Sequence, residues 1–286
     1  MRPLSTKRVG PEKLRQLLPQ LDSHEFSPDV FEKTGIFIIR GAIPLETLSL
    51  WQTAWQEFYD SGLTSDRPIN KYNPVAVDQE PPPVLAKMHE HPGLLDIVEK
   101  ALGPDIALYN QRFVIKDHQS RGPVFAHQDF PYHLGWPTKA SAFVALGPVT
   151  PENGGLFFYP GSHQYGYFGD AGEVNTEILG PDWPKICPSL EPGDVALMNS
   201  STWHGSGPHV SGPDRIVADI IYQPADDPSG IALLRGHWQT EIFLDRKQRD
   251  RLFIRSRASR LKELQSRVDE LEGKFGSSAV EPAIRQ

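Results

Sequence analysis

Residues 121–136, RGPVFAHQDFPYHLGW, carry the pattern from which both the fold and the chemistry of this chain are inferred. The centre of the stretch is His127-Gln128-Asp129. Residues two apart on an extended segment point to the same side of the chain, so His127 and Asp129 can reach one metal ion. A third protein ligand must then come from a distant part of the sequence.

His204, in the segment NSSTWHGSG, is the best candidate for that third ligand, because the buried-strand pattern GDVALMNS leads directly to it. Two histidines and one carboxylate are the usual protein ligands of mononuclear iron(II) in oxygenases. Arg215 opens the next apolar stretch, where its guanidinium can hold the far carboxylate of a 2-oxo acid through two parallel hydrogen bonds. Ser206 follows His204 closely enough to add a hydroxyl to the same carboxylate.

The chain divides into a helix-rich first third and a body of short strands. Gly35 and Gly41 bracket the strand pattern IFII, and the apolar positions Leu45, Leu48, Leu50 and Trp51 repeat at helical spacing after it. Two further helical pieces are expected around a break at His91-Pro92. From Asp105 onward, apolar runs alternate with turn residues as far as Pro228, where the strand pattern is expected to end. The predicted ligands are spread over this body, so residues 1–240 are predicted to form one domain with an N-terminal helical flank.

The C-terminal part is predicted to be a helix over residues 241–275, followed by a disordered tail at 276–286. Apolar residues in the helix follow the 3-4 spacing of a coiled coil at Leu261, Leu264, Val268, Leu271 and Phe275. Such a short stretch fits either a helix that docks on its own domain or a helix that mediates a homodimer.

Composition excludes several classes of protein. The chain has 29 Lys and Arg against 36 Asp and Glu, a net charge of −7, so a nucleic-acid partner is not expected. Cys187 is the only cysteine, which excludes an intrachain disulfide. The N-terminus lacks the apolar core of a signal peptide, and no apolar run reaches membrane-spanning length. A cytoplasmic protein that acts on a small molecule and has no membrane association is the expectation.

The strand IALYNQRFVIK has a polar face and a mostly apolar face. Alternation places Asn110, Arg112 and Lys116 on the polar face, which can line the interior of the domain and bind cosubstrate or simply face solvent. His133, Trp136 and Lys139, which follow the HxD motif, either line a substrate entrance or are ordinary loop residues.

Taken together, these segments resemble the phytanoyl-CoA dioxygenase family of iron(II)- and 2-oxoglutarate-dependent oxygenases, over roughly residues 30–225. The resemblance rests on FEKTGIFIIRGAIP, FAHQD, PENGGLFFYPGSH, LEPGDVALMNSSTWHGSG and DRIVADIIYQP, in that order.

The resemblance implies a mostly β protein with flanking helices and a double-stranded β-helix core, the cupin-like jelly roll. It implies that His127, Asp129 and His204 bind Fe(II), that Arg215 and Ser206 bind 2-oxoglutarate, and that O2 is the oxidant. Related halogenases carry a small residue at the position of Asp129, so hydroxylation is the expected reaction, with desaturation, ring formation and epoxidation open.

Two alternatives remain at this point. One is a non-redox cupin-like metal-binding protein or isomerase, which has no need of Arg215 as an anchor for a 2-oxo acid. The other is a catalytically inactive scaffold, against which the presence of all four key residues argues.

Overall fold

The computed structural model describes residues 8–60, 71–72, 81–118, 120–167, 172–238, 262–267, 269–270 and 273. It contains two compact units, Met1–Ile242 and Phe243–Gln286. The second unit has helical residues at 262–267 and 269–270. Four of the five positions in the predicted coiled-coil stripe lie outside the described residues, as does the predicted tail at 276–286, so the homodimer stays a prediction.

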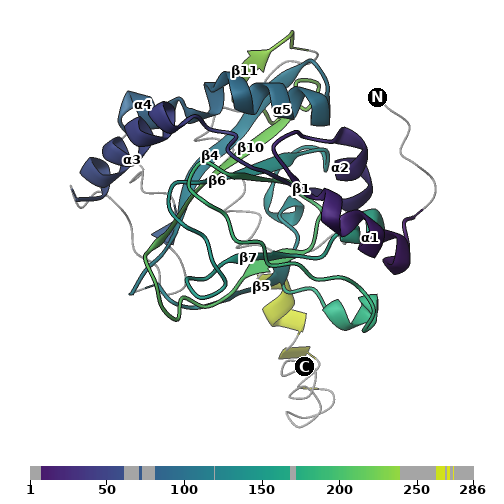
Figure 1. Ribbon diagram of the computed structural model, residues 1–286. Helices are drawn as coiled ribbons and strands as arrows, with labels where there is room; N and C mark the ends of the chain where they lie inside the picture. The colour runs from purple at the N-terminus through teal and green to yellow at the C-terminus, as the bar shows by residue number, and fades with distance from the viewer. Residues whose placement is uncertain are drawn as a thin grey trace. The chain divides into compact units, whose positions relative to one another are not determined.

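The first unit consists of strands with helices on one side (Figure 1). The helices are α1 (Pro11–Leu17), α2 (Pro28–Thr34), α3 (Leu45–Asp60), α4 (Pro83–Ala86) and α5 (Pro92–Leu102). Short 3-10 helices lie at η1 (Leu18–Gln20), η2 (Met88–Glu90), η3 (Phe130–Tyr132), η4 (Ser162–Tyr165) and η5 (Thr176–Leu179). The strands are β1 (Asp22–Ser23), β2 (Ile36–Ile39), β3 (Lys71–Tyr72), β4 (Ile106–Lys116), β5 (Val124–His127), β6 (Ala140–Ala145), β7 (Leu156–Phe158), β8 (Val195–Asn199), β9 (His204–Ser206), β10 (Arg215–Pro224) and β11 (Ala232–Arg235).

Two sheets form the body of this unit. Within the described residues, the large sheet has eight strands, in the order β1-β2-β8-β6-β10-β4-β11 with β3 beside β4, and the small sheet has the order β5-β9-β7. Strands distant in sequence are neighbours in both sheets, as in a jelly roll. Strand β11 corrects the expectation that strands end at Pro228: it is short, and it forms by pairing with the edge of β4.

Helix α5 packs against β4, β10 and β6 of the large sheet, and α2 packs against β2 (Figure 1). Helix α3 buries Leu48, Trp51, Trp55 and Phe58, and the ring centroid of Trp55 lies 4.5 Å from that of Phe113 on β4. Leu45 and Leu50 were wrongly grouped with these positions, since they are 78% and 59% exposed and lie off the buried stripe. None of the described helices is both long enough and apolar enough to cross a bilayer.

Gly35 links helix α2 to strand β2 and supports a distant turn. The helix begins at the cap Ser27, whose Oγ accepts the Val30 N–H, and it ends at Gly35 with φ of 71°. The Gly35 carbonyl accepts the N–H of Asn199 and the hydroxyl of Thr202, both at 2.9 Å. A Cβ at Gly35 would lie 2.4 Å from both His163 Nδ1 and Thr202 Oγ1, so a side chain is excluded there.

Gly35→Ala is expected to destabilise the fold more than Gly41→Ala does. Gly41 has φ of 56°, but the nearest neighbour of an added Cβ is 3.9 Å away. Both substitutions carry the left-handed backbone penalty, roughly 1–2 kcal/mol, and Gly35→Ala adds an overpacking penalty of about 1–3 kcal/mol. Urea unfolding of the two variants measures the difference, and equal losses would show that the packing around Gly35 is unimportant.

Candidate metal centre

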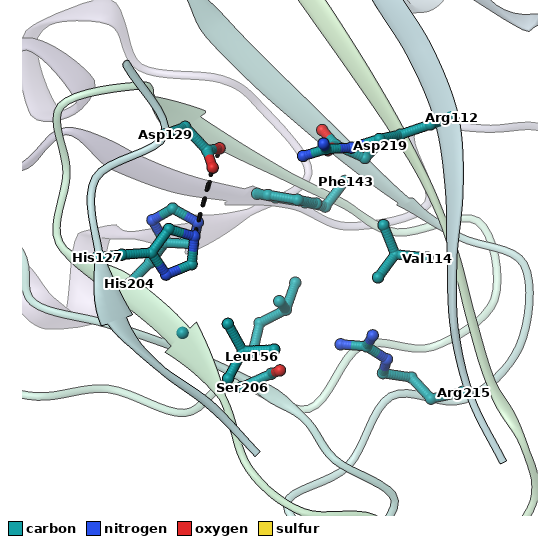
Figure 2. A pocket seen from close by; sticks show the side chains of 12 residues that line it. Arg112, Val114, His127, Asp129, Phe143, Leu156, His204, Ser206, Arg215 and Asp219 are labelled. Atoms are coloured by element: carbon teal, nitrogen blue, oxygen red, sulfur yellow. Dashed lines mark hydrogen bonds and ion pairs between the residues drawn. The ribbon is translucent and has the colours of Figure 1, made fainter. Parts of the chain in front are cut away.

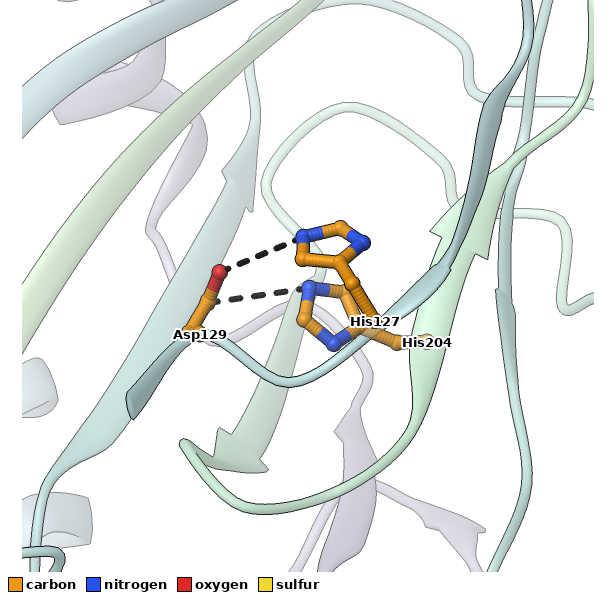
Figure 3. Close-up of side chains that lie close together, drawn as sticks. All are labelled: His127, Asp129 and His204. Carbon is orange, nitrogen blue, oxygen red and sulfur yellow. Dashed lines mark ion pairs between the residues drawn. The ribbon is translucent and has the colours of Figure 1, made fainter. Parts of the chain in front are cut away.

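The side chains of His127, Asp129 and His204 converge at one end of the small sheet (Figure 3). His127 ends β5, His204 begins β9, and the two are register partners in the antiparallel pair. The distance from Asp129 Oδ1 to His127 Nε2 is 3.5 Å, and that from Oδ2 to His204 Nε2 is 3.6 Å. Two donors about 2.1 Å from one ion can be at most about 4.2 Å apart, and both separations meet that limit.

Backbone carbonyls fix the tautomer of each histidine. Nδ1 of His127 lies 2.9 Å from the Phe125 carbonyl, and Nδ1 of His204 lies 3.0 Å from the Thr202 carbonyl. A carbonyl oxygen can only accept, so each Nδ1 carries the proton and each Nε2 keeps its lone pair. Metal-binding histidines are held in this way in known sites, with the second ring nitrogen bonded to the protein.

Burial and charge set the protonation of the three groups. Burial lowers the pKa of His204 to about 4. Burial alone would raise the pKa of Asp129, but His204 and His127 outweigh it and hold that pKa well below its usual range. Burial lowers the pKa of His127 while Asp129 raises it, and the net shift is upward. Oδ2 of Asp129 is buried and has no hydrogen-bond partner among the described residues. An ionised carboxylate oxygen and a neutral imidazole that face one point fit a divalent cation.

The three side chains line a pocket between the two sheets that holds about 370 Å³ of space, part of it open to solvent (Figure 2). Arg215 and Ser206 line the same pocket, and both are buried, at 1% and 3% exposure. Nη1 of Arg215 donates to the Gly154 carbonyl at 3.2 Å. Of the residues predicted to bind cosubstrate, Arg215, Ser206 and Arg112 therefore share the pocket with the triad, whereas Asn110 is not among the residues that line it.

His204 is reached differently from the sequence prediction. The strand pattern before it forms β8 in the large sheet, and a turn at residues 200–203 then carries the chain into β9 of the small sheet. Because Thr202 in this turn bonds to Gly35, the position of His204 depends on the junction between α2 and β2.

Asp219 was missed by the sequence prediction. It lies on β10 opposite Arg112 on β4. Its Oδ2 accepts a hydrogen bond from Arg112 Nε at 2.7 Å and forms an ion pair with Nη2 at 2.7 Å. Burial raises the pKa of Asp219 to about 6, although Arg112 acts in the opposite direction. One sequence signal could have found Asp219: it lies four residues after Arg215 on an otherwise apolar strand, so both side chains point to the same face.

Lys116 is a second buried cation beside Arg215, its register partner on β10. Its Nζ donates to the carbonyls of Gly122 and Gly207. Burial lowers the pKa of Lys116 to about 7, and the Arg215 guanidinium adds to the shift.

A buried ion pair ties down the segment that follows Asp129. Lys139 and Asp227 are both fully buried, and Lys139 Nζ bonds to Asp227 Oδ2 and, at 2.8 Å, to Gln223 Oε1. The Trp136 N–H donates to Asp227 at 2.8 Å. Lys139 therefore anchors this segment rather than lining an open entrance, whereas Trp136 is 40% exposed.

Comparison with known proteins identifies the family. The sequence profile described as Phytanoyl-CoA dioxygenase (PhyH) matches residues 31–217. The chain belongs to the phytanoyl-CoA dioxygenase family. Membership confirms the predicted family and the predicted enzyme class, the Fe(II)- and 2-oxoglutarate-dependent dioxygenases.

Curated relatives are distant. Methylphosphonate hydroxylase of Gimesia maris is 26% identical over 170 residues, 55% of this chain and 61% of the relative. The 1-deoxypentalenic acid 11-beta-hydroxylase of Streptomyces exfoliatus is 26% identical over 250 residues, 76% of this chain and 87% of the relative.

Solved structures share the fold. The epimerase SnoN, in complex with Fe3+, alpha ketoglutarate and nogalamycin RO, has a TM-score of 0.63 at 19% identity. The match covers 77% of this chain and 88% of the SnoN chain. EctD from S. alaskensis, with 2-oxoglutarate and 5-hydroxyectoine, has a TM-score of 0.59 at 21% identity, covering 85% and 86%. These likenesses confirm the predicted mostly β architecture with a jelly-roll core.

Unfolding measurements at several pH values test the burial of Lys116. Its pKa is about 7 in the folded protein and about 10.4 when exposed. Between these values the unfolded chain binds a proton that the folded chain lacks, so the free energy of unfolding rises with pH, by at most about 1.4 kcal/mol per pH unit from this group. The stabilisation is complete above pH 10 and lost by pH 7. In urea titrations between about pH 7 and 9, Lys116→Met is expected to remove the contribution of this group to the slope of the unfolding free energy against pH. Parallel curves for the variant and the wild-type protein would contradict the assigned pKa shift.

Proposed function

We propose that His127, Asp129 and His204 hold Fe(II), that Arg215 and Ser206 hold 2-oxoglutarate, and that the enzyme hydroxylates a small molecule with release of succinate and CO2. One observation carries the proposal: two imidazole Nε2 atoms and an unpartnered carboxylate oxygen converge in the pocket that also contains a buried arginine. In SnoN and EctD structures, 2-oxoglutarate or alpha ketoglutarate is present, which supports the same cosubstrate here.

The bound iron would supply the activation of O2 that oxidises both the 2-oxo acid and the substrate. The protein's own part is to hold and orient. Asp129 and His204 present donors without first losing a proton at pH 7. Arg215, fixed at Gly154, offers a planar fork to the distal carboxylate of the 2-oxo acid. Its burial excludes water from that ion pair, which strengthens it.

Hydroxylation is favoured over the alternatives by two observations. Asp129 is present as a third ligand, and the two curated relatives at 26% identity are both named hydroxylases. A non-redox cupin or isomerase leaves the buried Arg215 unexplained. The epimerase SnoN shows that related folds also carry out other outcomes, so product analysis decides the reaction.

The metal assignment is tested by loading the protein with Fe(II) without oxygen and measuring iron after gel filtration. Wild type is expected to retain one iron per chain. His204→Ala should weaken iron binding by more than about 100-fold, beyond what loss of a residue that only orients a ligand costs. His24→Ala is the control, because His24 lies outside the triad. Full iron retention by His204→Ala with an intact thermal transition would disprove the assignment.

The cosubstrate assignment is tested by calorimetric titration of 2-oxoglutarate into Mn(II)-loaded protein, which needs no knowledge of the substrate. Charge-assisted hydrogen bonds contribute roughly 1.5–3 kcal/mol each, so Arg215→Ala should weaken binding by at least about tenfold. Arg215→Lys should restore only part of the affinity, because an ammonium is a point charge rather than a fork. Metal content should be unchanged. An unaltered affinity in Arg215→Ala would place the 2-oxo acid elsewhere.

A further inference from the structure

Three polar atoms on one face of the large sheet have no hydrogen-bond partner among the described residues. They are Asp219 Oδ1 on β10, Asn110 Oδ1 on β4 and Ser141 Oγ on β6. Asp219 and Ser141 are fully buried. A buried polar group without a partner destabilises a fold by about 1–3 kcal/mol, so three of them in adjacent rows are unusual.

Strand register places Asp219 on the wall of the pocket, and Asn110 and Ser141 in the adjoining row of the same sheet face. Asp219 pairs with Arg112 on one side and Phe143 on the other, and all three line the pocket. Ile221 pairs in the same way with Asn110 and Ser141. Residues two apart on a strand share a face, so Asn110 and Ser141 form the row next to Asp219 on the face that borders the pocket.

This wall is at the far end from the proposed cosubstrate anchor. Asp219 and Arg215 are four residues apart on β10, which is about 13 Å of strand. Figure 2 shows Arg112 and Asp219 near Asp129, with Arg215 and Ser206 at the other end of the pocket. A 2-oxo acid that joins Arg215 to the triad leaves the wall at Asp219 for the second reactant.

The unpartnered atoms specify the chemistry of that reactant. The carboxylate oxygen of Asp219 and the amide oxygen of Asn110 can only accept hydrogen bonds, so their complement must donate them. Arg112 is aligned by a hydrogen bond and an ion pair to Asp219 Oδ2, which leaves the pair formally neutral.

We propose that Asp219, Asn110 and Ser141 form the recognition site for the primary substrate, and that this substrate presents hydroxyl or amino hydrogens to them. The proposal rests on the proposed function, because it assigns Arg215 and the triad to the cosubstrate. Asp219 has a second role as the positioning residue of Arg112.

Proton relaxation in the Mn(II)-loaded protein with 2-oxoglutarate tests the site without a known substrate, since Mn(II) shortens the relaxation times of protons bound nearby. Three probes with three carbons each are compared: glycerol carries only hydroxyls, propylamine only an ammonium group, and propionate only a carboxylate. Glycerol or propylamine is expected to relax faster than propionate, and which of the two does so identifies the donor as hydroxyl or amine.

Two conservative variants test whether the relaxed probe binds at Asp219 and Ser141. Asp219→Asn and Ser141→Ala are each expected to weaken the preferred probe by about tenfold, the loss of one good hydrogen bond. Ser49→Ala, on the exposed side of α3, is the matched control and should change nothing. Ser141→Ala removes a hydroxyl that bonds to no described residue, so it keeps the test independent of folding defects.

The outcomes are separable from those of the proposed function. If Mn(II) relaxes the 2-oxoglutarate protons in both variants, the cosubstrate site is intact. If Mn(II) does not relax them in the wild-type protein, the result contradicts the proposed function and not the recognition site. Preference for propionate, equal relaxation of all three probes, contact with none of them, or indifference of the preferred probe to both variants overturns the proposed recognition site.

Discussion

The antiparallel pairing of β5 with β9 is the constraint on which the candidate metal centre depends. It places His127 directly opposite His204, although the two are far apart in the sequence. A slip of one residue in either strand would turn one imidazole to the other face of the sheet, because side chains alternate along a strand. The carbonyls of Phe125 and Thr202 then fix both rings, so strand register and ring orientation are set by backbone atoms close to the ligands.

Packing from the N-terminal flank supports this register. The turn between β8 and β9 bonds through Thr202 to Gly35, where only a glycine fits. On the other side of the site, the pair of Lys139 and Asp227 holds the segment that follows Asp129. Removing one partner of a buried ion pair typically costs 3–5 kcal/mol, so this anchor resists local opening next to the ligand. The helical flank and the loop anchor therefore act on the two ends of the same triad.

The sequence was sufficient to single out His127, Asp129, His204 and Arg215 as candidates, because each stands at a strand end or just beyond one, in an order typical of the family. The structure brings all four to one pocket, and their roles stay predictions. It was insufficient where a role depends on a partner across the sheet. Asp219 pairs with Arg112 across two strands, and the register that joins them is not visible in either strand alone. The same reason explains β11, whose four residues form a strand only because the edge of β4 is available. Leu45 and Leu50 were misjudged because apolar character does not reveal which side of a helix meets the sheet.

The candidate metal ligands and the proposed recognition residues lie on different sheets, so the two groups can vary separately. Two of the three candidate metal ligands belong to the small sheet, whereas Arg112, Asp219 and Ser141 belong to three strands of the large sheet. Side chains in the rows of Asp219 and Ile221 can change without altering the β5–β9 register, because no strand is shared between the sheets. Arg215 lies on the large sheet as well, but four residues before Asp219 on the same strand. A single strand, β10, thus carries the proposed cosubstrate anchor Arg215 at one end and the proposed recognition row further along. If the proposed roles hold, substitutions in a few rows of the large sheet would change the substrate while the candidate metal centre stays the same.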